Sequence, residues 1–190
     1  KREGKEEVVG ARFVIGADGT MSFVRKWLYP HLPVAYAHCY RECFPAQDLP
    51  LERDYVHMFF MPELAPYYFD AYYKEDLVLV EIVSRVGGGI RDLTEKAKSF
   101  LAQGYGFDPK RKPVKVEACT EPILYRGLFA KSFIPAQGNI LLVGDAAGLQ
   151  MPVTAEGIGT ALKSGFIAAE AVAQAIHSGV TAEKLYLPQI

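Results

Sequence analysis

Two short apolar segments, one near each end of the chain, constrain the fold most. Residues 8–16 (VVGARFVIG) run into Asp18-Gly19, and residues 139–143 (NILLV) run directly into Gly144-Asp145. Apolar runs of this length bounded by Gly are typical of buried strands in an α/β sheet. Each is followed by a predicted helix, residues 20–28 in the first case and 156–177 in the second. Both ends of the chain therefore predict a strand, an acidic turn and a helix.

The middle of the chain has a different pattern. Aromatic and β-branched runs separated by Pro, Asp and Glu clusters predict an antiparallel sheet. These runs cover residues 34–44, 55–61, 67–73 and 77–85, with a further strand expected over 114–119 and a helix over 92–103. We therefore predict an α/β chain that is α+β in the middle. One domain, formed by residues 1–30 and 136–190, is interrupted by an antiparallel β domain formed by residues 31–135.

Composition narrows the class of protein. The 190 residues carry 21 basic and 22 acidic side chains, a net charge of −1, without the basic excess that nucleic-acid binders show. No apolar run reaches the roughly 18 residues that span a bilayer, and the charged residues 1–7 do not resemble a signal peptide. The expected location is the cytoplasm, with membrane association left open. The chain begins at Lys1 without Met, which we interpret as a processed or cut chain.

The three cysteines, Cys39, Cys43 and Cys119, are odd in number and lack zinc-ligand spacing with histidines. We expect a reducing compartment and no metal site. Cys39 and Cys43 could form a redox pair, but two cysteines without a special role is the favoured interpretation.

The C-terminal motif has the chemistry of a ligand site. A strand that ends in Gly144-Asp145 places a carboxylate at the carboxyl edge of the sheet, where open α/β sheets bind ligands. Asp145 can accept hydrogen bonds from a polyhydroxylated chain, and the small Ala146 permits close approach. The long helix then begins near residues 156–159, and a helix N-terminus favours an anionic or electron-rich ligand edge.

The N-terminal motif repeats this arrangement on a smaller scale. Asp18 and Gly19 form the turn, and Ser22 is available at the start of the helix. Arg25 is expected to face a phosphate or to pair with Asp18. Either motif alone is compatible with a plain strand-turn-helix, but their combination in this order favours a shared ligand.

The two motifs resemble those of a known family. GADGTMSFVR resembles the D-G motif of the class A FAD-dependent oxidoreductases, the p-hydroxybenzoate hydroxylase group. NILLVGDAAGLQMPVTAEGIGTALKSGFIAAEAV resembles the G-D motif of that family and its following helix. The string TAEGI…ALKSG…AAE is most similar to the branch of geranylgeranyl reductases and electron-transfer-flavoprotein dehydrogenases. The similar regions cover about a quarter of the chain.

The resemblance implies a partial, Rossmann-like FAD-binding domain interrupted by a substrate domain. The first motif would lie near the pyrophosphate and the path of the reduced nicotinamide, Asp145 would hold the ribityl chain, and residues 152–159 would line the isoalloxazine. The implied cofactor-binding residues are Asp18, Gly19, Arg25, Gly144, Asp145, Ala146, Pro152, Thr154, Glu156, Gly157, Ile158 and Gly159. The implied electron donor is NAD(P)H or another reductant, including an electron-donor protein.

Tyr67, Phe69 and Tyr73 are the candidate substrate-binding residues, because the branch carries an aromatic substrate-facing strand at this place. They belong to an aromatic cluster that can equally be sheet core. The usual Trp and Pro of the branch are absent, and Ala71 and Lys74 stand roughly in their places. The expected substrate is small and apolar or aromatic, which makes peripheral membrane contact an open question.

Four functions remain open. The first is reduction of an isoprenoid or other apolar substrate by hydride transfer from reduced flavin. The second is a flavin-dependent monooxygenase or halogenase acting on an aromatic compound, and the third is an electron relay to quinone. The fourth is a domain without catalysis of its own, because the G-x-G-x-x-G turn that holds the ADP pyrophosphate is not found: Gly87-Gly88-Gly89 is not followed by a convincing helix at the right spacing and lies in the β-rich middle of the chain. We expect an enzyme in the parent protein and weak or no FAD binding by this chain alone.

Overall fold

The computed structural model describes residues 8–85 and 87–190. The chain separates into two compact units. Unit 1 contains residues 1–35 and 122–190, and unit 2 contains residues 36–121. The charged run at residues 1–7 lies outside the described residues. Helices and strands are mixed and one sheet is antiparallel, as the predicted fold class requires.

Unit 1 is built on a small sheet in the order β1-β8-β7, formed by Val14–Gly16, Ile140–Leu142 and Ala136–Gln137. β1 and β8 are parallel, with Gly16 opposite Leu142, so both acidic turns leave the same edge of the sheet. The run before Val14 was predicted as strand but is not, since Val8 and Val9 are exposed and pair with no strand. β1 is an edge strand, paired on one side only within the described chain.

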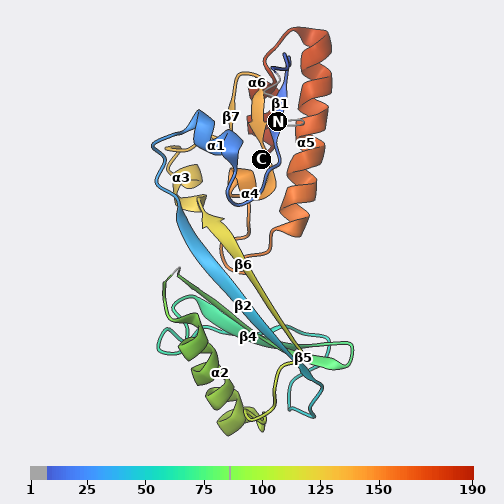
Figure 1. Cartoon of the computed structure of the whole chain (residues 1–190). Coiled ribbons are helices and arrows are strands. Elements are labelled where there is room, and N and C mark those ends of the chain that lie inside the picture. The colour runs from blue at the N-terminus through green and yellow to red at the C-terminus, as the bar shows by residue number, and fades with distance from the viewer. Residues whose placement is uncertain (1–7, 86) are drawn as a thin grey trace. The chain divides into compact units, whose positions relative to one another are not determined.

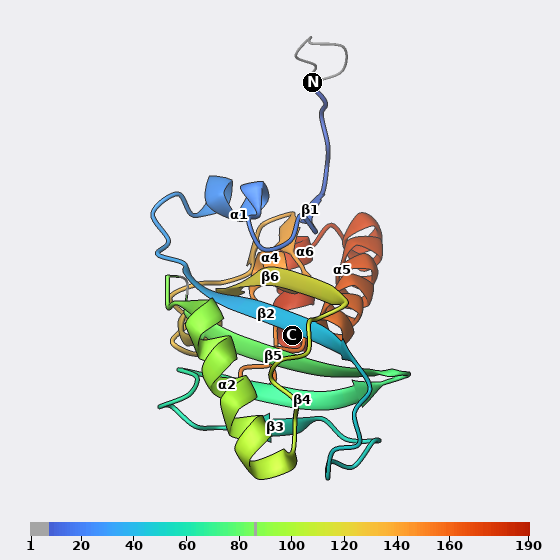
Figure 2. The same cartoon turned by 60° about the horizontal axis from the view of Figure 1, so that its bottom comes forward.

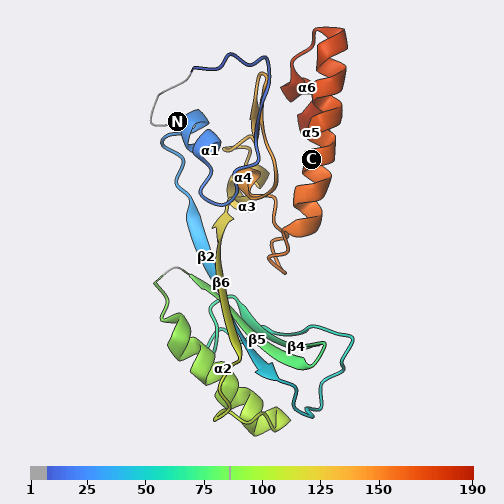
Figure 3. The same cartoon turned by 45° about the vertical axis from the view of Figure 1, so that its right-hand side comes forward.

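Helices cover both faces of this sheet (Figures 1 and 3). On one face, α5 (Ile158–Ser178) and α6 (Ala182–Tyr186) pack against Leu141 and Val143 through small residues of α5. On the other face, Leu142 packs with α1 (Phe23–Leu28) and with residues near α3 (Tyr125–Phe129). A 3₁₀ turn, Leu187–Gln189, follows α6.

Residues 122–135 pack in unit 1, although the predicted boundary assigned them to the middle domain. Leu124 and Phe133 are buried in a cluster with Leu142, Ala146 and Ala147. Gly148 has a φ of +68°, and a Cβ there would lie 2.4 Å from the Cβ of Leu124. This close contact fixes the segment before α3 against the turn that follows β8.

Unit 2 is a five-stranded sheet in the order β3-β4-β5-β2-β6 (Figure 2). The strands are His57–Phe59, Tyr68–Lys74, Leu77–Arg85, Ala35–Pro45 and Lys115–Ile123, in the same order. The β4–β5 pair is antiparallel and closes through the predicted tight turn. Its helix, α2 (Ile90–Tyr105), covers one face. Phe44, Phe69 and Ile82 point from the sheet into this core.

Among the described residues, none of the helices has the length and apolar character that a membrane span requires.

Candidate functional site

The two acidic turns meet at one edge of the unit 1 sheet. Thr20, just after the first turn, donates from its hydroxyl to Oδ2 of Asp145 at 3.3 Å. Gly16 accepts the backbone N–H of Val143 at 3.1 Å, which extends the parallel pairing to the start of the second turn. The structure therefore brings together two motifs that lie more than 100 residues apart in the sequence.

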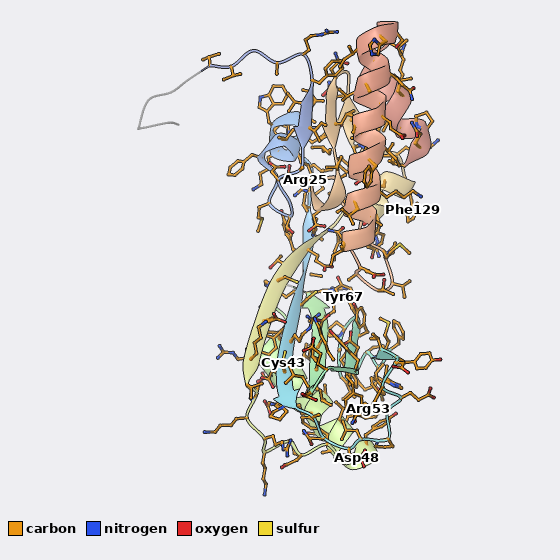
Figure 4. The ribbon with its side chains drawn as sticks, turned by 90° about the vertical axis from the view of Figure 1, so that its right-hand side faces the viewer. Arg25, Cys43, Asp48, Arg53, Tyr67 and Phe129 are labelled. Atoms are coloured by element: carbon orange, nitrogen blue, oxygen red, sulfur yellow. The ribbon has the colours of Figure 1, made fainter. Side chains whose placement is uncertain are left out.

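Arg25 holds the two turns together from inside the unit (Figure 4). Its side chain is 1% exposed. Nη1 donates to the carbonyl oxygens of Asp145 at 3.1 Å and Ala146 at 2.9 Å, and Nη2 donates to that of Thr20. The sequence predicted a phosphate or Asp18 as its partner. Its hydrogen-bond partners are instead backbone carbonyl oxygens, because the guanidinium points inward from α1 toward the turn after β8.

Asp18 caps α1. Its Oδ2 accepts the backbone N–H groups of Phe23 at 2.7 Å and Val24 at 3.2 Å. Partial burial acts to raise the pKa of Asp18, but the hydrogen bonds from Ser22 and from these N–H groups outweigh it and lower the pKa. The carboxylate is therefore anionic at neutral pH. Gly19 has a φ of +72° and open space where a Cβ would be, so this turn leaves room beside it.

Asp145 lies at the first turn of α4 (Gly144–Ala147), directly after β8. Its side chain is half-buried. Gly144 has a φ of +54°, donates its N–H to Oγ of Ser164 at 3.0 Å, and approaches Ala161 so closely that a Cβ would lie 3.0 Å from the Ala161 Cβ. The first turns of α5 are thereby packed against the end of β8, next to Asp145.

The loop between α4 and α5 folds back toward Asp145. A Cβ on Gly157 would lie 3.2 Å from Oδ1 of Asp145, which explains the glycine at this position. Ala155 adopts a positive φ of 56°, a conformation that non-glycine residues rarely take and that concentrates at functional sites. Pro152, Thr154, Glu156, Ile158 and Gly159 are all exposed on this loop and on the start of α5.

The N-terminus of α5 is free to meet a ligand. Gly157 is its N-cap and provides no side-chain hydrogen bond, and the first turn contains no acidic residue. The early N–H groups of a helix lack intrahelical acceptors and carry partial positive charge. A Cβ on Gly159 would meet nothing within 4 Å, so a flat ligand can approach the backbone there. A carboxylate beside an uncapped helix start fits the ribityl chain and the electron-rich edge of a flavin.

An apolar hollow of about 610 Å³ lies in unit 1 beside the loop between α4 and α5. It is lined by residues of α3, by Leu149 and Pro152 of the loop after α4, and by Leu187 and Ile190. Pro152 is therefore the one predicted cofactor residue that also lines this hollow.

The predicted substrate residues lie in unit 2 and do not share one surface. Phe69 is fully buried in the core under α2, stacked on Phe59 with ring centroids 4.6 Å apart. Tyr73 is nine-tenths buried, and its hydroxyl bonds the loop around Gln47 and Leu49. Tyr67 is half-buried just before β4 (Figure 4). Phe69 and Tyr73 therefore have the roles of core side chains.

The opposite face of β4 carries the groups with unusual electrostatics, which sequence reasoning missed. Tyr68, Asp70 and Tyr72 alternate with the core residues and point away from α2. Burial, reinforced by the charge of Glu81, raises the pKa of Asp70 to about 7, and its Oδ1 lacks a hydrogen-bond partner. Burial also raises the pKa of Tyr72 to about 12. Side chains alternate between the two faces of a strand. Once Phe69 and Tyr73 are assigned to the core, this alternation places Asp70 and Tyr72 on the opposite face.

Known proteins resemble this chain over most of its length. No family model matches. The chain is 31% identical over 179 residues to digeranylgeranylglycerophospholipid reductase 3 of Methanosphaera stadtmanae, a match that covers 90% of this chain and 42% of that protein. It is 28% identical over 181 residues to the digeranylgeranylglycerophospholipid reductase of Methanocaldococcus jannaschii, with 91% and 44% covered. The chain thus spans less than half the length of these relatives.

The solved structures share the fold. A geranylgeranyl bacteriochlorophyll reductase-like protein of Thermoplasma acidophilum superposes with a TM-score of 0.66 and 21% identity, covering 89% of this chain and 42% of that one. A probable FAD-dependent monooxygenase of Pseudomonas aeruginosa gives a TM-score of 0.60 and 16% identity, covering 94% and 50%. The resemblance predicted from the two terminal motifs is confirmed in sequence and in fold: the curated relatives are digeranylgeranylglycerophospholipid reductases, and the solved structures that share the fold include a geranylgeranyl reductase-like protein and an FAD-dependent monooxygenase.

Proposed function

We propose that this chain forms the flavin-facing part of an FAD-dependent oxidoreductase. The observation that carries the proposal is the meeting of the two motifs: Asp145 receives a hydrogen bond from Thr20, and Arg25 ties both turns to one edge of the β1–β8 sheet. In open α/β sheets this carboxyl edge is the place of ligand binding. The homology to flavoprotein reductases supports the same assignment.

In this proposal each element has a role toward the cofactor. Asp145 accepts hydrogen bonds from ribityl hydroxyls, and the uncapped start of α5 places N–H groups at the edge of the isoalloxazine that gains negative charge on reduction. The first turn, with Asp18 and Gly19, lies toward the pyrophosphate. FAD, when bound, supplies the hydride chemistry, and the protein supplies position and electrostatics.

The proposed cofactor site includes further chain. Within the described residues β1 pairs with β8 on one side only, and Val14 and Ile15 are partly exposed, whereas parallel sheets are normally covered and extended on both sides. Ile158, Leu162 and Phe166 also form an exposed apolar stripe on one side of α5. We propose that the ADP-binding half of the domain pairs with β1 and covers this stripe. Without it, the residues that the structure describes offer no dinucleotide turn for the adenosine diphosphate.

The proposed reaction is reduction of an isoprenoid or similar apolar double bond by hydride transfer from the reduced cofactor. The curated relatives are named as reductases of digeranylgeranylglycerophospholipid, which supports this reaction. NAD(P)H or an electron-donor protein is the proposed reductant. A lipid substrate would bring the protein to a membrane surface, which we propose as a peripheral contact.

The test uses the full-length protein that carries this chain, purified with FAD. Asp145→Asn should weaken FAD binding roughly 10- to 100-fold, because a charge-assisted hydrogen bond contributes about 1.5–3 kcal/mol. Glu170→Gln, an acid-to-amide change on the exposed surface of α5, is the matched control and should leave binding unchanged. Equal FAD affinity in wild type and Asp145→Asn would contradict the proposed site.

The reaction class is tested separately, by mass spectrometry of an unsaturated isoprenoid lipid incubated with reductant. A gain of two hydrogens per double bond, equal in the presence and absence of oxygen, is the expected result. A product that contains oxygen and forms only in air would identify a monooxygenase instead.

A further inference from the structure

Two cysteines from different strands of unit 2 lie side by side. β6 neighbours β2 in the sheet. Thr120 contacts His38 at 3.0 Å, and Glu117 contacts Arg41 at 3.3 Å. Residue numbers on β6 therefore fall as those on β2 rise, so the two strands are antiparallel (Figure 1). This register puts Cys119 directly opposite Cys39. The side chains of opposed residues in such a pair project to the same face of the sheet.

The third member of the group comes from β6. Glu121 is two residues beyond Cys119 and therefore projects to the same face. The two sulfur atoms and a carboxylate oxygen of Glu121 all lie within 4.8 Å of one another. Ligand atoms around a tetrahedral zinc are about 3.8 Å apart when the metal–sulfur distance is about 2.3 Å. Small side-chain rotations would bring these three atoms to that spacing.

The charges around Cys39, Cys119 and Glu121 favour the binding of a cation. The pKa of Cys39 is raised by its hydrogen bond with Cys119, and further by burial and the charge of Glu121. The same hydrogen bond lowers the pKa of Cys119. Glu81 of β5 adds a further negative charge, and Arg41 of β2 is the nearby positive one. Two sulfurs and a carboxylate oxygen thus lie close enough together for one metal ion to bind all three.

We propose that Cys39, Cys119 and Glu121 form a site for a thiolate-preferring divalent metal ion of the zinc class. Thiolate ligands select zinc over the hard cations, and three protein ligands leave one tetrahedral position for water or another ligand. The spacing of cysteines along the chain predicts no such site, because the ligands come from two strands that are distant in the sequence. Cys43 lies on the same strand as Cys39, about 13 Å away by strand geometry, too far for the redox pair that the sequence left open.

The site should bind with release of a proton. Cys39 must lose its proton to become a ligand, so affinity is expected to rise with pH. The groups that face it are Cys119 and Glu121 of β6, Glu81 of β5, Tyr68 of β4 and Arg41 of β2. The negative charges among them favour a bound cation.

The test is titration of the reduced chain with Zn²⁺ against a chromophoric chelator, together with Co²⁺, whose thiolate complexes absorb in the near ultraviolet. The expected result is one ion per chain and a thiolate–cobalt band in the wild type. Cys39→Ser and Cys119→Ser should each remove the band, and Glu121→Gln should weaken Zn²⁺ binding. Cys43→Ala is the matched control and should retain both ion and band.

Circular dichroism of each variant establishes that unit 2 remains folded. Cys119 is exposed, so its replacement by Ser should not disturb the sheet. Absence of binding by the folded, reduced wild type would overturn the proposal. So would full binding by a folded Cys119→Ser variant, or a chain that forms a Cys39–Cys119 disulfide in preference to holding Zn²⁺.

Discussion

The guanidinium of Arg25 donates to the backbone carbonyl of Asp145 at 3.1 Å and thereby joins the two ends of the chain. A helix that begins after the first acidic turn is thus anchored to the backbone of the second. The contact is internal, since Arg25 is 1% exposed.

Replacing Arg25 by Met should destabilise unit 1. The carbonyl groups of Thr20, Asp145 and Ala146 would lose their donor while remaining covered, which should lower the free energy of unfolding by about 3–5 kcal/mol. Loss of helical circular dichroism during denaturation by urea reports on unit 1, which contains the long helix α5. Lys26→Met, an exposed neighbour on α1, is the control. Similar midpoints for the two variants would show that the buried contact contributes little.

FAD binding to the isolated chain should be weak. The described part offers the proposed ribityl and isoalloxazine side but no dinucleotide turn for the pyrophosphate. Titration of the purified chain with FAD, followed by flavin fluorescence, should show no stoichiometric complex. A yellow, one-to-one complex that survives gel filtration would mean that unit 1 alone completes the cofactor site.

Stability should depend on pH through Asp70. Its pKa is about 7 in the folded protein, against an ordinary value of 3.8. Because the folded pKa is the higher one, the favourable contribution of the neutral carboxyl is fully present below about pH 4 and is lost as the pH rises to about 7. Asp70→Asn should remove this loss and be more stable than wild type at pH 8 by about 2–4 kcal/mol.

Urea denaturation at pH 5 and pH 8 checks this prediction, with exposed Asp54→Asn as the control. The difference between Asp70→Asn and wild type should shrink at pH 5. A difference that is the same at both pH values would argue against a protonated Asp70.

A buried ion pair attaches α2 to the sheet. Nζ of Lys98 lies 3.0 Å from Oε2 of Glu42, and both side chains are about nine-tenths covered. Lys98→Met should cost about 3–5 kcal/mol, because it leaves the Glu42 carboxylate buried without its cation. The double variant Glu42→Gln/Lys98→Met should recover a large part of that loss. Lys96→Met, exposed on the same helix, should be nearly neutral, and denaturation followed by circular dichroism compares all three.

How far the sequence predicts this structure depends on whether a signal is local. The β-branched run of residues 77–85 and the apolar pattern of the long C-terminal helix are local signals, so both elements were placed within a few residues of their observed ends. The meeting of Asp18 and Asp145 at one sheet edge followed from the parallel pairing that such motifs adopt. Short elements without periodicity, such as α3 and β7, gave no signal that could be recognised.

Non-local relationships could not be predicted. Both faces of β4 are aromatic, so the sequence alone could not decide that Phe69 and Tyr73 enter the core while Asp70 and Tyr72 point the other way. The assignment depends on which face α2 covers. The pairing of Cys39 with Cys119 depends in the same way on the register between β2 and β6.

The outer edge of β1, which pairs with no strand of the described chain, has a consequence for how such a protein is synthesised. Backbone donors and acceptors on that side can be satisfied by any extended segment, including the same strand of a second molecule. Synthesis proceeds from the N-terminus, so an upstream dinucleotide half would be folded and ready to pair when β1 leaves the ribosome. A chain released without that half would instead self-associate as its concentration rises.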